Sequence, residues 1–190
     1  MKVGIIILAV VVCIAALIGV QAVSVNNQLV EKREAVTAAW GNVDVALQRR
    51  ADLIPNLVET VKGFAAQEKQ VIDSVTAARA QLAGARTPQE KLAANQQIDT
   101  ALGRLLVVVE NYPQLKSNEN FMRLQDELAG SENRIAVERR KYNETVQAYN
   151  TAIGRFPNNL LAGMLGFQRV DEYFKVAAGA QNAPQVKFER

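Results

Sequence analysis

The sequence predicts an all-α protein, with an N-terminal transmembrane helix followed by an antiparallel, up-and-down four-helix bundle. Three observations predict this fold. Residues 3–20 form a continuous apolar run, VGIIILAVVVCIAALIGV, that contains no charged side chain. In the remainder, apolar residues recur at alternating spacings of four and three, which is the pattern of a packed helix. Strand-like alternation of useful length does not occur in the sequence.

The apolar run is long enough to cross a bilayer, because 18 residues in a helix span roughly 27 Å. We expect residues 1–24 to be a retained single-pass membrane anchor. A cleaved signal peptide is the alternative, and Lys2 with the small-residue pattern at 20–22 favours it. The run is longer than such peptides usually need, and its basic region is one lysine. Positive charges near a spanning helix favour its cytoplasmic side. Lys2 lies on one side of the apolar run and Lys32 and Arg33 lie further out on the other, so these charges leave the orientation of the soluble part open.

Residues 25–156 are expected to form the bundle, and its first two segments meet at a turn. The seam of the first segment covers residues 29–47 and that of the second covers residues 57–82. Asp52 can cap the second segment, and Pro55 is tolerated in the first turn of a helix. Both residues are therefore predicted to form a helix-to-helix turn.

The third and fourth segments have their own boundary signals. Residues 87–90, Thr-Pro-Gln-Glu, are a capping box with proline at the first helical position. Pro113 ends the third segment, Ser117 can cap the fourth, and Pro157 ends it. Segments of about 25, 30, 25 and 37 residues with short connections favour antiparallel neighbours.

After Pro157 the sequence predicts residues 157–175 to be a short apolar segment near the base of the bundle, and residues 176–190 to be a flexible tail. The apolar segment is too short to span a membrane. Two interpretations stand equally: its side chains rest on the lipid interface, or they pack under the bundle. Those side chains are Leu160, Leu161, Met164, Leu165 and Phe167.

Arg33 and Glu68 occupy core-type positions in the two facing seams. Folding the chain near residue 52 would bring them within one helical turn, which predicts a buried ion pair that fixes register. The alternative is a proton-active carboxylate, as in bundles that hold two metal ions. Such sites add Glu-x-x-His, and this chain has no histidine, so structural pairing is favoured.

Tyr142-Asn143 recurs seven residues later as Tyr149-Asn150, which places both tyrosines on one helical stripe. Core tyrosines with hydroxyl partners are expected. A paired ligand platform is the less favoured interpretation.

The predicted turn would place Arg49, Arg50, Asn56 and Glu59 together at the end of the bundle farthest from the membrane. Turn formation alone does not need two adjacent arginines. They can favour the dipole of the preceding helix, or they can contact an acidic partner. We take these four residues as the candidate partner-binding tip.

Composition excludes several kinds of function. The net charge of +3 arises from 22 basic and 19 acidic residues that are dispersed along the chain, which argues against nucleic-acid binding. The absence of histidine removes the commonest general base and metal ligand. The single cysteine, Cys13, lies in the apolar run and allows neither a disulfide nor a zinc site within one chain. We expect no catalytic residues, cofactor or metal.

Three stretches resemble the signatures of the LemA family. They are AWGNVDVALQRRADLIPNLVETVKGFAAQE (39–68), the Ala78-Arg79 pair, and YNETVQAYNTAIGRFPNNLLA (142–162). Two residues depart from these signatures: Gly41 stands where the family often has serine, and Gln67 stands where it often has histidine. The resemblance implies a bacterial protein with one N-terminal transmembrane helix, an antiparallel four-helix domain and no established enzymatic activity. It also implies an association with membrane proteases or envelope quality control, and one relative is linked to magnetosome membranes.

The leading functional hypothesis is a non-enzymatic, membrane-anchored helical scaffold or adaptor. Its expected partners are the lipid bilayer and an unidentified membrane or envelope protein, such as a membrane protease or a quality-control protein. A homo-oligomer is also left open. A small-molecule sensor bundle is the alternative. An enzyme ranks last, because the carboxylates are dispersed at helical spacing and no nucleophile is paired with a base.

Overall fold

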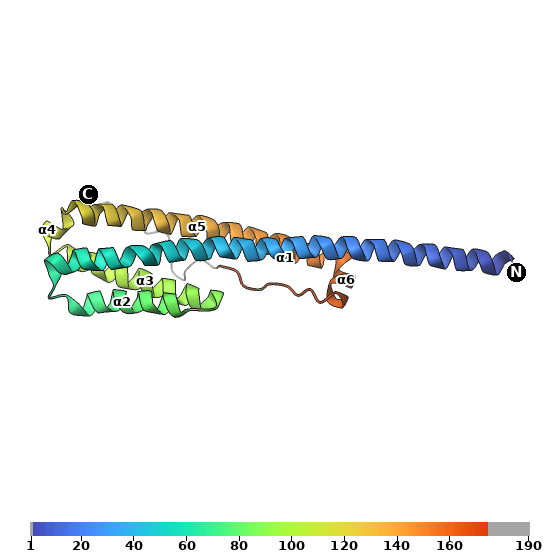
Figure 1. The fold of residues 1–190 in the computed structure, drawn as a ribbon, viewed down its shortest axis with the longest axis horizontal. Coiled ribbons are helices and arrows are strands. Elements are labelled where there is room, and N and C mark those ends of the chain that lie inside the picture. Colours follow the sequence, from blue (N-terminus) through green and yellow to red (C-terminus); the bar gives the residue numbers. More distant parts are fainter. Residues whose placement is uncertain (1, 175–190) are drawn as a thin grey trace, which may run out of the picture. The chain divides into compact units, whose positions relative to one another are not determined.

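The structure is a computed structural model that describes residues 2–174. Within this part of the chain every regular element is a helix, so the predicted all-α class is confirmed (Figure 1). Six helices are described there, which differs from the four predicted segments. Their limits are α1 Lys2–Ala65, α2 Lys69–Gly84, α3 Pro88–Val109, α4 Pro113–Lys116, α5 Glu119–Gly154 and α6 Asn158–Met164.

The main departure from the predicted fold is that α1 runs unbroken through Pro55. A proline inside a helix has no N–H to donate to the carbonyl four residues earlier, here that of Ala51. Arg79 of α2 supplies the missing donor, because its Nε lies 3.0 Å from the Ala51 carbonyl oxygen. A side chain from a neighbouring helix therefore compensates for the hydrogen bond that Pro55 removes.

The predicted turn at Asp52 and Pro55 is consequently wrong. The chain turns at residues 66–68, after the end of α1. Asp52 caps no helix, and its carboxylate accepts a hydrogen bond of 2.8 Å from the side-chain amide of Gln48, one turn earlier.

The chain divides into two compact units, residues 40–138 and residues 1–39 together with 139–190. Both α1 and α5 contribute to each unit. The predicted domain limits at residues 24 and 156 stay a prediction.

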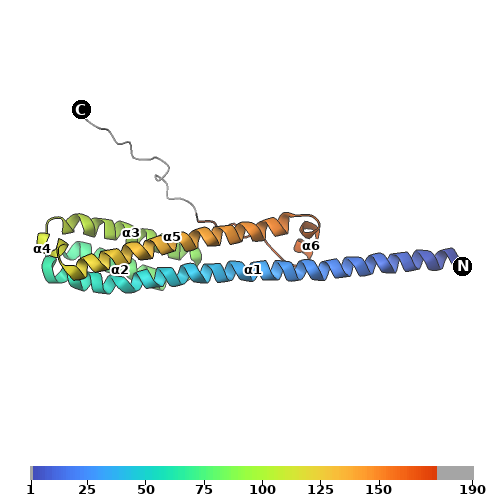
Figure 2. The ribbon, with the colours of Figure 1, turned by 90° about the horizontal axis from the view of Figure 1, so that it is seen from above.

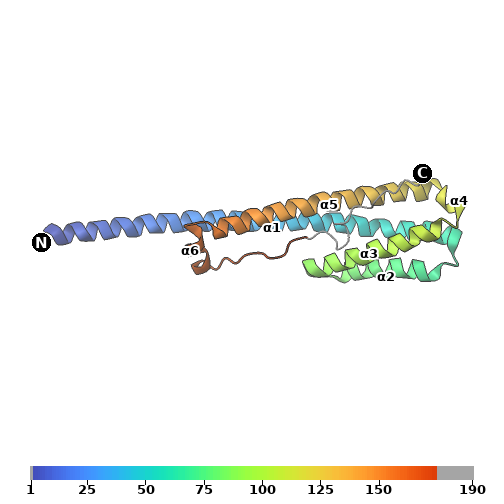
Figure 3. The same cartoon turned by 180° about the vertical axis from the view of Figure 1, so that it is seen from behind.

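In the unit of residues 40–138, α2 and α3 lie side by side and run antiparallel (Figure 3). The predicted capping box begins α3: the Thr87 hydroxyl accepts from the Glu90 N–H at 3.2 Å, and the Glu90 carboxylate accepts from the Thr87 N–H at 3.2 Å. Hydrogen bonds from the backbone N–H groups of Arg86 and Thr87 lower the pKa of Glu90. At the start of α5 the cap is Asn118, which accepts from the Phe121 N–H at 3.1 Å, and not Ser117.

Apolar residues from all the helices of residues 40–138 form the core of that unit. Phe64, which falls within the predicted seam of residues 57–82, is 41% exposed, and its neighbour Ala65 is buried. The largest fully buried side chains of the unit are Val43, Leu47, Ile54, Val61, Val75, Ile98, Leu105, Leu115, Phe121 and Ile135.

In the other unit, two asparagines of α5 hold the segment of residues 167–174 by its backbone. Asn143 donates to the Phe174 carbonyl at 2.8 Å and accepts from the Phe174 N–H at 2.9 Å. Asn150 makes the same two bonds with Val170, at 2.7 and 2.9 Å. Each side-chain amide thus pairs with the segment as a neighbouring strand would.

The tyrosine beside Asn150 supports the same segment. The Tyr149 ring is buried, and its hydroxyl donates to the Gln168 carbonyl at 3.1 Å, as expected for a core tyrosine with a hydroxyl partner. Burial raises the pKa of this hydroxyl. The repeated Tyr-Asn pair of α5 therefore holds the segment of residues 167–174 in place.

Within the same unit, α6 lies beside α1 (Figure 2). The Asn158 side chain donates to the Ala152 carbonyl at 2.9 Å and to the Gln28 side chain at 3.3 Å. Among the described residues, α1 is the one helix long and apolar enough to cross a membrane, and its apolar window is entirely unburied. The predicted tail, residues 176–190, lies outside the described residues.

We expect each asparagine to protect the backbone amide that it binds. Replacing Asn150 by alanine should speed hydrogen exchange at the Val170 amide, and replacing Asn143 should do so at Phe174, because each lost pair contributes about 1–2 kcal/mol. Exchange with residue-level fragmentation in detergent micelles measures this. Asn133→Ala, at an exposed site of the same helix, is the control. Unchanged exchange at both amides would contradict the backbone pairing.

Candidate functional site

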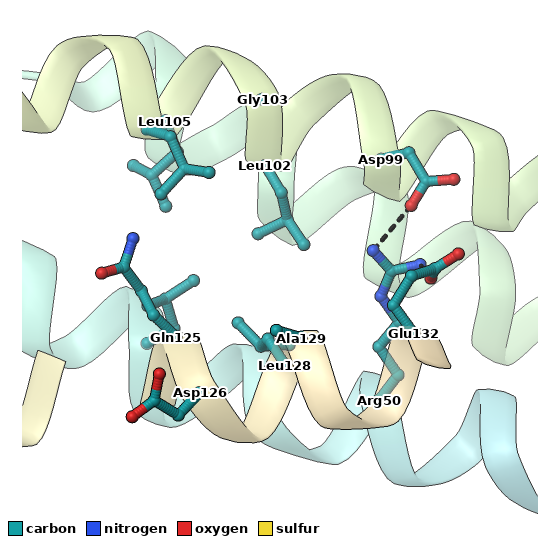
Figure 4. Close-up of a pocket in the computed structure, with 12 residues that line it drawn as sticks. Arg50, Asp99, Leu102, Gly103, Leu105, Gln125, Asp126, Leu128, Ala129 and Glu132 are labelled. Atoms are coloured by element: carbon teal, nitrogen blue, oxygen red, sulfur yellow. Dashed lines mark hydrogen bonds and ion pairs between the residues drawn. The ribbon is translucent and has the colours of Figure 1, made fainter. Parts of the chain in front are cut away.

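The unit of residues 40–138 has a groove between α3 and α5, with a volume of about 530 Å³ (Figure 4). Leucines from α3 and α5 form its walls, and Leu57 of α1 also lines it. We call it the α3–α5 groove. It is lined by Arg50, Leu57, Asp99, Leu102, Gly103, Leu105, Leu106, Gln125, Asp126, Leu128, Ala129 and Glu132.

One end of the α3–α5 groove holds a buried arginine. Arg50 is only 5% exposed, and its guanidinium reaches Asp99 of α3 and Glu132 of α5, both at 2.6 Å. It also donates to the Asn95 side chain at 2.9 Å. Three helices therefore meet at one cation, an arrangement that fixes their register more than it adds stability.

The position of Arg50 follows from the helical seam of α1. The buried residues Leu47, Ile54 and Leu57 flank it at spacings that continue the pattern of four and three. Successive residues of a helix point about 100° apart, so Arg49 is exposed while Arg50 is buried. The two adjacent arginines therefore have different surroundings and different roles.

The predicted partner-binding tip is accordingly wrong. Arg49, Asn56 and Glu59 are exposed, but they lie along an unbroken helix. Glu59 pairs with Lys62 one turn later, at 2.8 Å. Arg50 points inward, because α1 does not turn at residue 52.

The predicted ion pair of Arg33 and Glu68 is also absent. Arg33 lies near Glu34 at 3.9 Å and over the ring of Phe167, 5.4 Å from its centroid. Glu68 accepts a hydrogen bond of 2.9 Å from the Tyr112 hydroxyl, which raises the pKa of that tyrosine. The predicted register required a fold-back at residue 52, and α1 continues past that point.

The sequence reasoning missed Asp99, Glu132 and Gly103. Extending the seam of residues 29–47 by the same spacing would have reached Arg50, and a charge at a core position signals a buried partner. Gly103 gave no signal as a lone glycine in a helix. The structure places Gly103 in the lining of the α3–α5 groove.

The α3–α5 groove combines apolar walls with charged side chains. Asp99, Asp126 and Glu132 supply three carboxylates against the one guanidinium of Arg50, so the groove carries an excess of negative charge. Two of these carboxylates are engaged by Arg50. Over residues 2–174, no cluster of three or more His, Cys, Asp or Glu side chains is placed to hold a metal ion.

Arg50 and Arg49 form a matched pair for mutation. Arg50→Met should lower the free energy of unfolding by about 1–3 kcal/mol, because two part-buried carboxylates and Asn95 lose their donor. Arg49→Met should change it by no more than about 0.5 kcal/mol, as expected for an exposed site. Denaturant unfolding of the full chain in detergent measures both. Equal losses for the two variants would contradict the buried network.

Comparison with known proteins gives a matching family model and several relatives. The family model of the LemA family matches residues 39–188. The chain is 30% identical to the magnetosome protein MamQ of Magnetospirillum gryphiswaldense and to magnetosome protein MamQ 2 of Paramagnetospirillum magneticum. Each of these two alignments covers 80% of this chain and 66% of the relative, so the chain spans just under two thirds of these MamQ proteins.

A more distant relative is protein LemA of Metamycoplasma hominis, at 24% identity, with 76% of this chain and 67% of that protein covered. The stretch from residue 39 to residue 188 contains the α3–α5 groove and the Tyr-Asn pairs. This chain belongs to the LemA family.

Proposed function

We propose that this protein is a non-enzymatic adaptor, anchored in a bacterial inner membrane by a single pass of α1, which binds a protein partner in the α3–α5 groove. The observation that carries the proposal is the groove itself, an apolar trough between two helices with carboxylates along its edge. The unburied apolar window of α1 supports the anchor. The four longer helical segments of residues 40–138, from α1, α2, α3 and α5, support a four-helix bundle as the binding part, with the short α4 as a connection.

The shape and chemistry of the groove favour an amphipathic helix as the bound segment. Its walls are leucines, and Leu106 at the rim is 44% exposed. A helix laid into such a groove buries apolar residues at spacings of three and four. The excess of carboxylates favours lysine or arginine beside that apolar face, since complementary charge improves specificity and the rate of association.

Gly103 lies in the lining of the groove, and a side chain added there would meet no atom within 4 Å. The other described glycines have the same open space, so the case for binding rests on the groove and its charges. A larger side chain at position 103 would occupy space in the groove, which makes Gly103 the position for a blocking substitution.

The MamQ relatives support only the membrane association in this proposal. The MamQ proteins are named as magnetosome proteins, and membrane association is the property that we carry over to this chain. A membrane protease or an envelope quality-control protein remains the proposed partner class. A small-molecule sensor is a second candidate, because the cavity volume lies in the range of ligand pockets.

Crosslinking from the groove tests the adaptor function. A photoreactive residue in place of Leu106 should crosslink in native membranes to a segment with apolar spacing of three and four and with adjacent basic residues. Gly103→Leu should abolish the crosslink by filling the groove, with no loss of thermal stability. Gly130→Leu, also at a helical glycine with open space but away from the groove, should leave it intact.

Two results would count against the adaptor. One is a crosslink that survives Gly103→Leu, and the other is a loss that is equal for both glycine variants. A thermal shift of the full chain by small metabolites, absent in Gly103→Leu, would instead favour the sensor.

A further inference from the structure

The short helix α6 exposes large apolar side chains at a place where the fold gives them no partner. Phe156 is 79% exposed, Leu160 63% and Met164 85%. These residues are spaced by four, so the last two share one side of α6 and Phe156 precedes them. We call these three residues the α6 apolar face.

The opposite side of α6 fixes the helix in place. Asn158 and Ala162 are buried, and the Asn158 amide is held by the Ala152 carbonyl at 2.9 Å. Phe167, just after α6, is also buried. The α6 apolar face thus lies on the side of α6 opposite the buried residues Asn158 and Ala162.

The neighbour of α6 within this unit is the end of the apolar run of α1. An apolar cavity of about 350 Å³ lies between them, lined by Leu17, Ile18 and Gln21 of α1 and by Pro157, Leu160 and Leu161. Leu17 and Ile18 belong to the last turn of the uncharged run, and Gln21 is the first strongly polar residue after it. In a spanning helix this transition marks the boundary of the hydrocarbon core.

We propose that Phe156, Leu160 and Met164 insert into the lipid bilayer at its interface, beside the point where α1 leaves the membrane. The inference rests on the proposed anchor, because α1 sets the depth at which α6 lies. Apolar helix faces at such a boundary are buried about 5–10 Å deep, where the lipid headgroups meet the acyl chains. The cavity beside Leu17 and Ile18 is then filled by acyl chains and not by water.

The polar neighbours of the face fit the same position. Arg155 and Asn159 are exposed, and an arginine at this level can direct its guanidinium to lipid phosphates while its stem stays in the apolar layer. Lipid is favoured over a protein partner because the face adjoins the unburied surface of α1, where lipid already is the expected contact. From the sequence alone, contact with lipid and packing under the bundle were equally expected for this segment. In the structure Leu160 and Met164 are exposed, which favours lipid contact for them, whereas Phe167 is buried.

Spin labels on single cysteines test this inference in the full chain. Cys13→Ala removes the native thiol, and labels are placed by Leu160→Cys or Met164→Cys in vesicles of phosphatidylcholine and phosphatidylglycerol. Both sites are exposed, so the label disturbs no packing. Leu8→Cys, in the apolar run, reports the anchor. Val107→Cys, 71% exposed in the other unit, is the water-facing control.

Accessibility to oxygen and to a neutral nickel chelate gives the outcome. We expect labels at 160 and 164 to exclude nickel and admit oxygen, at a shallower depth than Leu8, while Val107 shows the reverse. Labels at 160 and 164 that behave like Val107, with Leu8 in lipid, would overturn the α6 insertion and leave the anchor standing. A label at Leu8 that is open to nickel would refute the anchor and this inference together.

Discussion

The carbonyl oxygen of Ala51 is the group on which this arrangement depends. Pro55 cannot donate to it, so an unbroken helix would leave a buried acceptor without a partner. Arg79 of α2 donates to it at 3.0 Å, and α1 continues to Ala65. Without that donor, the sequence around Pro55 would favour the turn that a proline usually signals.

The continuity of α1 determines the environment of Arg50. On an unbroken helix it falls between the buried residues Leu47 and Ile54, and its charge must enter the interior of residues 40–138. A buried cation is tolerated only with close partners, and Asp99 and Glu132 supply them from two other helices. The same three helices border the α3–α5 groove, so the ion network holds the walls of the proposed binding surface in register.

The sequence predicted the helical class and the capping box at Thr87, because both rest on local signals. It failed at Pro55, where a long-range hydrogen bond from Arg79 outweighed the local preference for a turn. The errors over Arg50 and Glu68 followed from that single misplaced turn. The hydrogen bonds of Asn143 and Asn150 and the place of Gly103 in the groove lining could not be predicted from residue spacing. They depend on which distant parts of the chain lie opposite these residues in the fold.

A double-mutant cycle between Arg79 and Pro55 tests the central claim most directly, by denaturant unfolding of the full chain in detergent. With Pro55 present, Arg79→Met should cost about 1–2 kcal/mol, because the Ala51 carbonyl loses its donor. In the Pro55→Ala background the N–H of residue 55 can bind that carbonyl, and the same replacement should be close to neutral. An equal loss in both backgrounds would contradict the claim that Arg79 is what allows α1 to pass through Pro55.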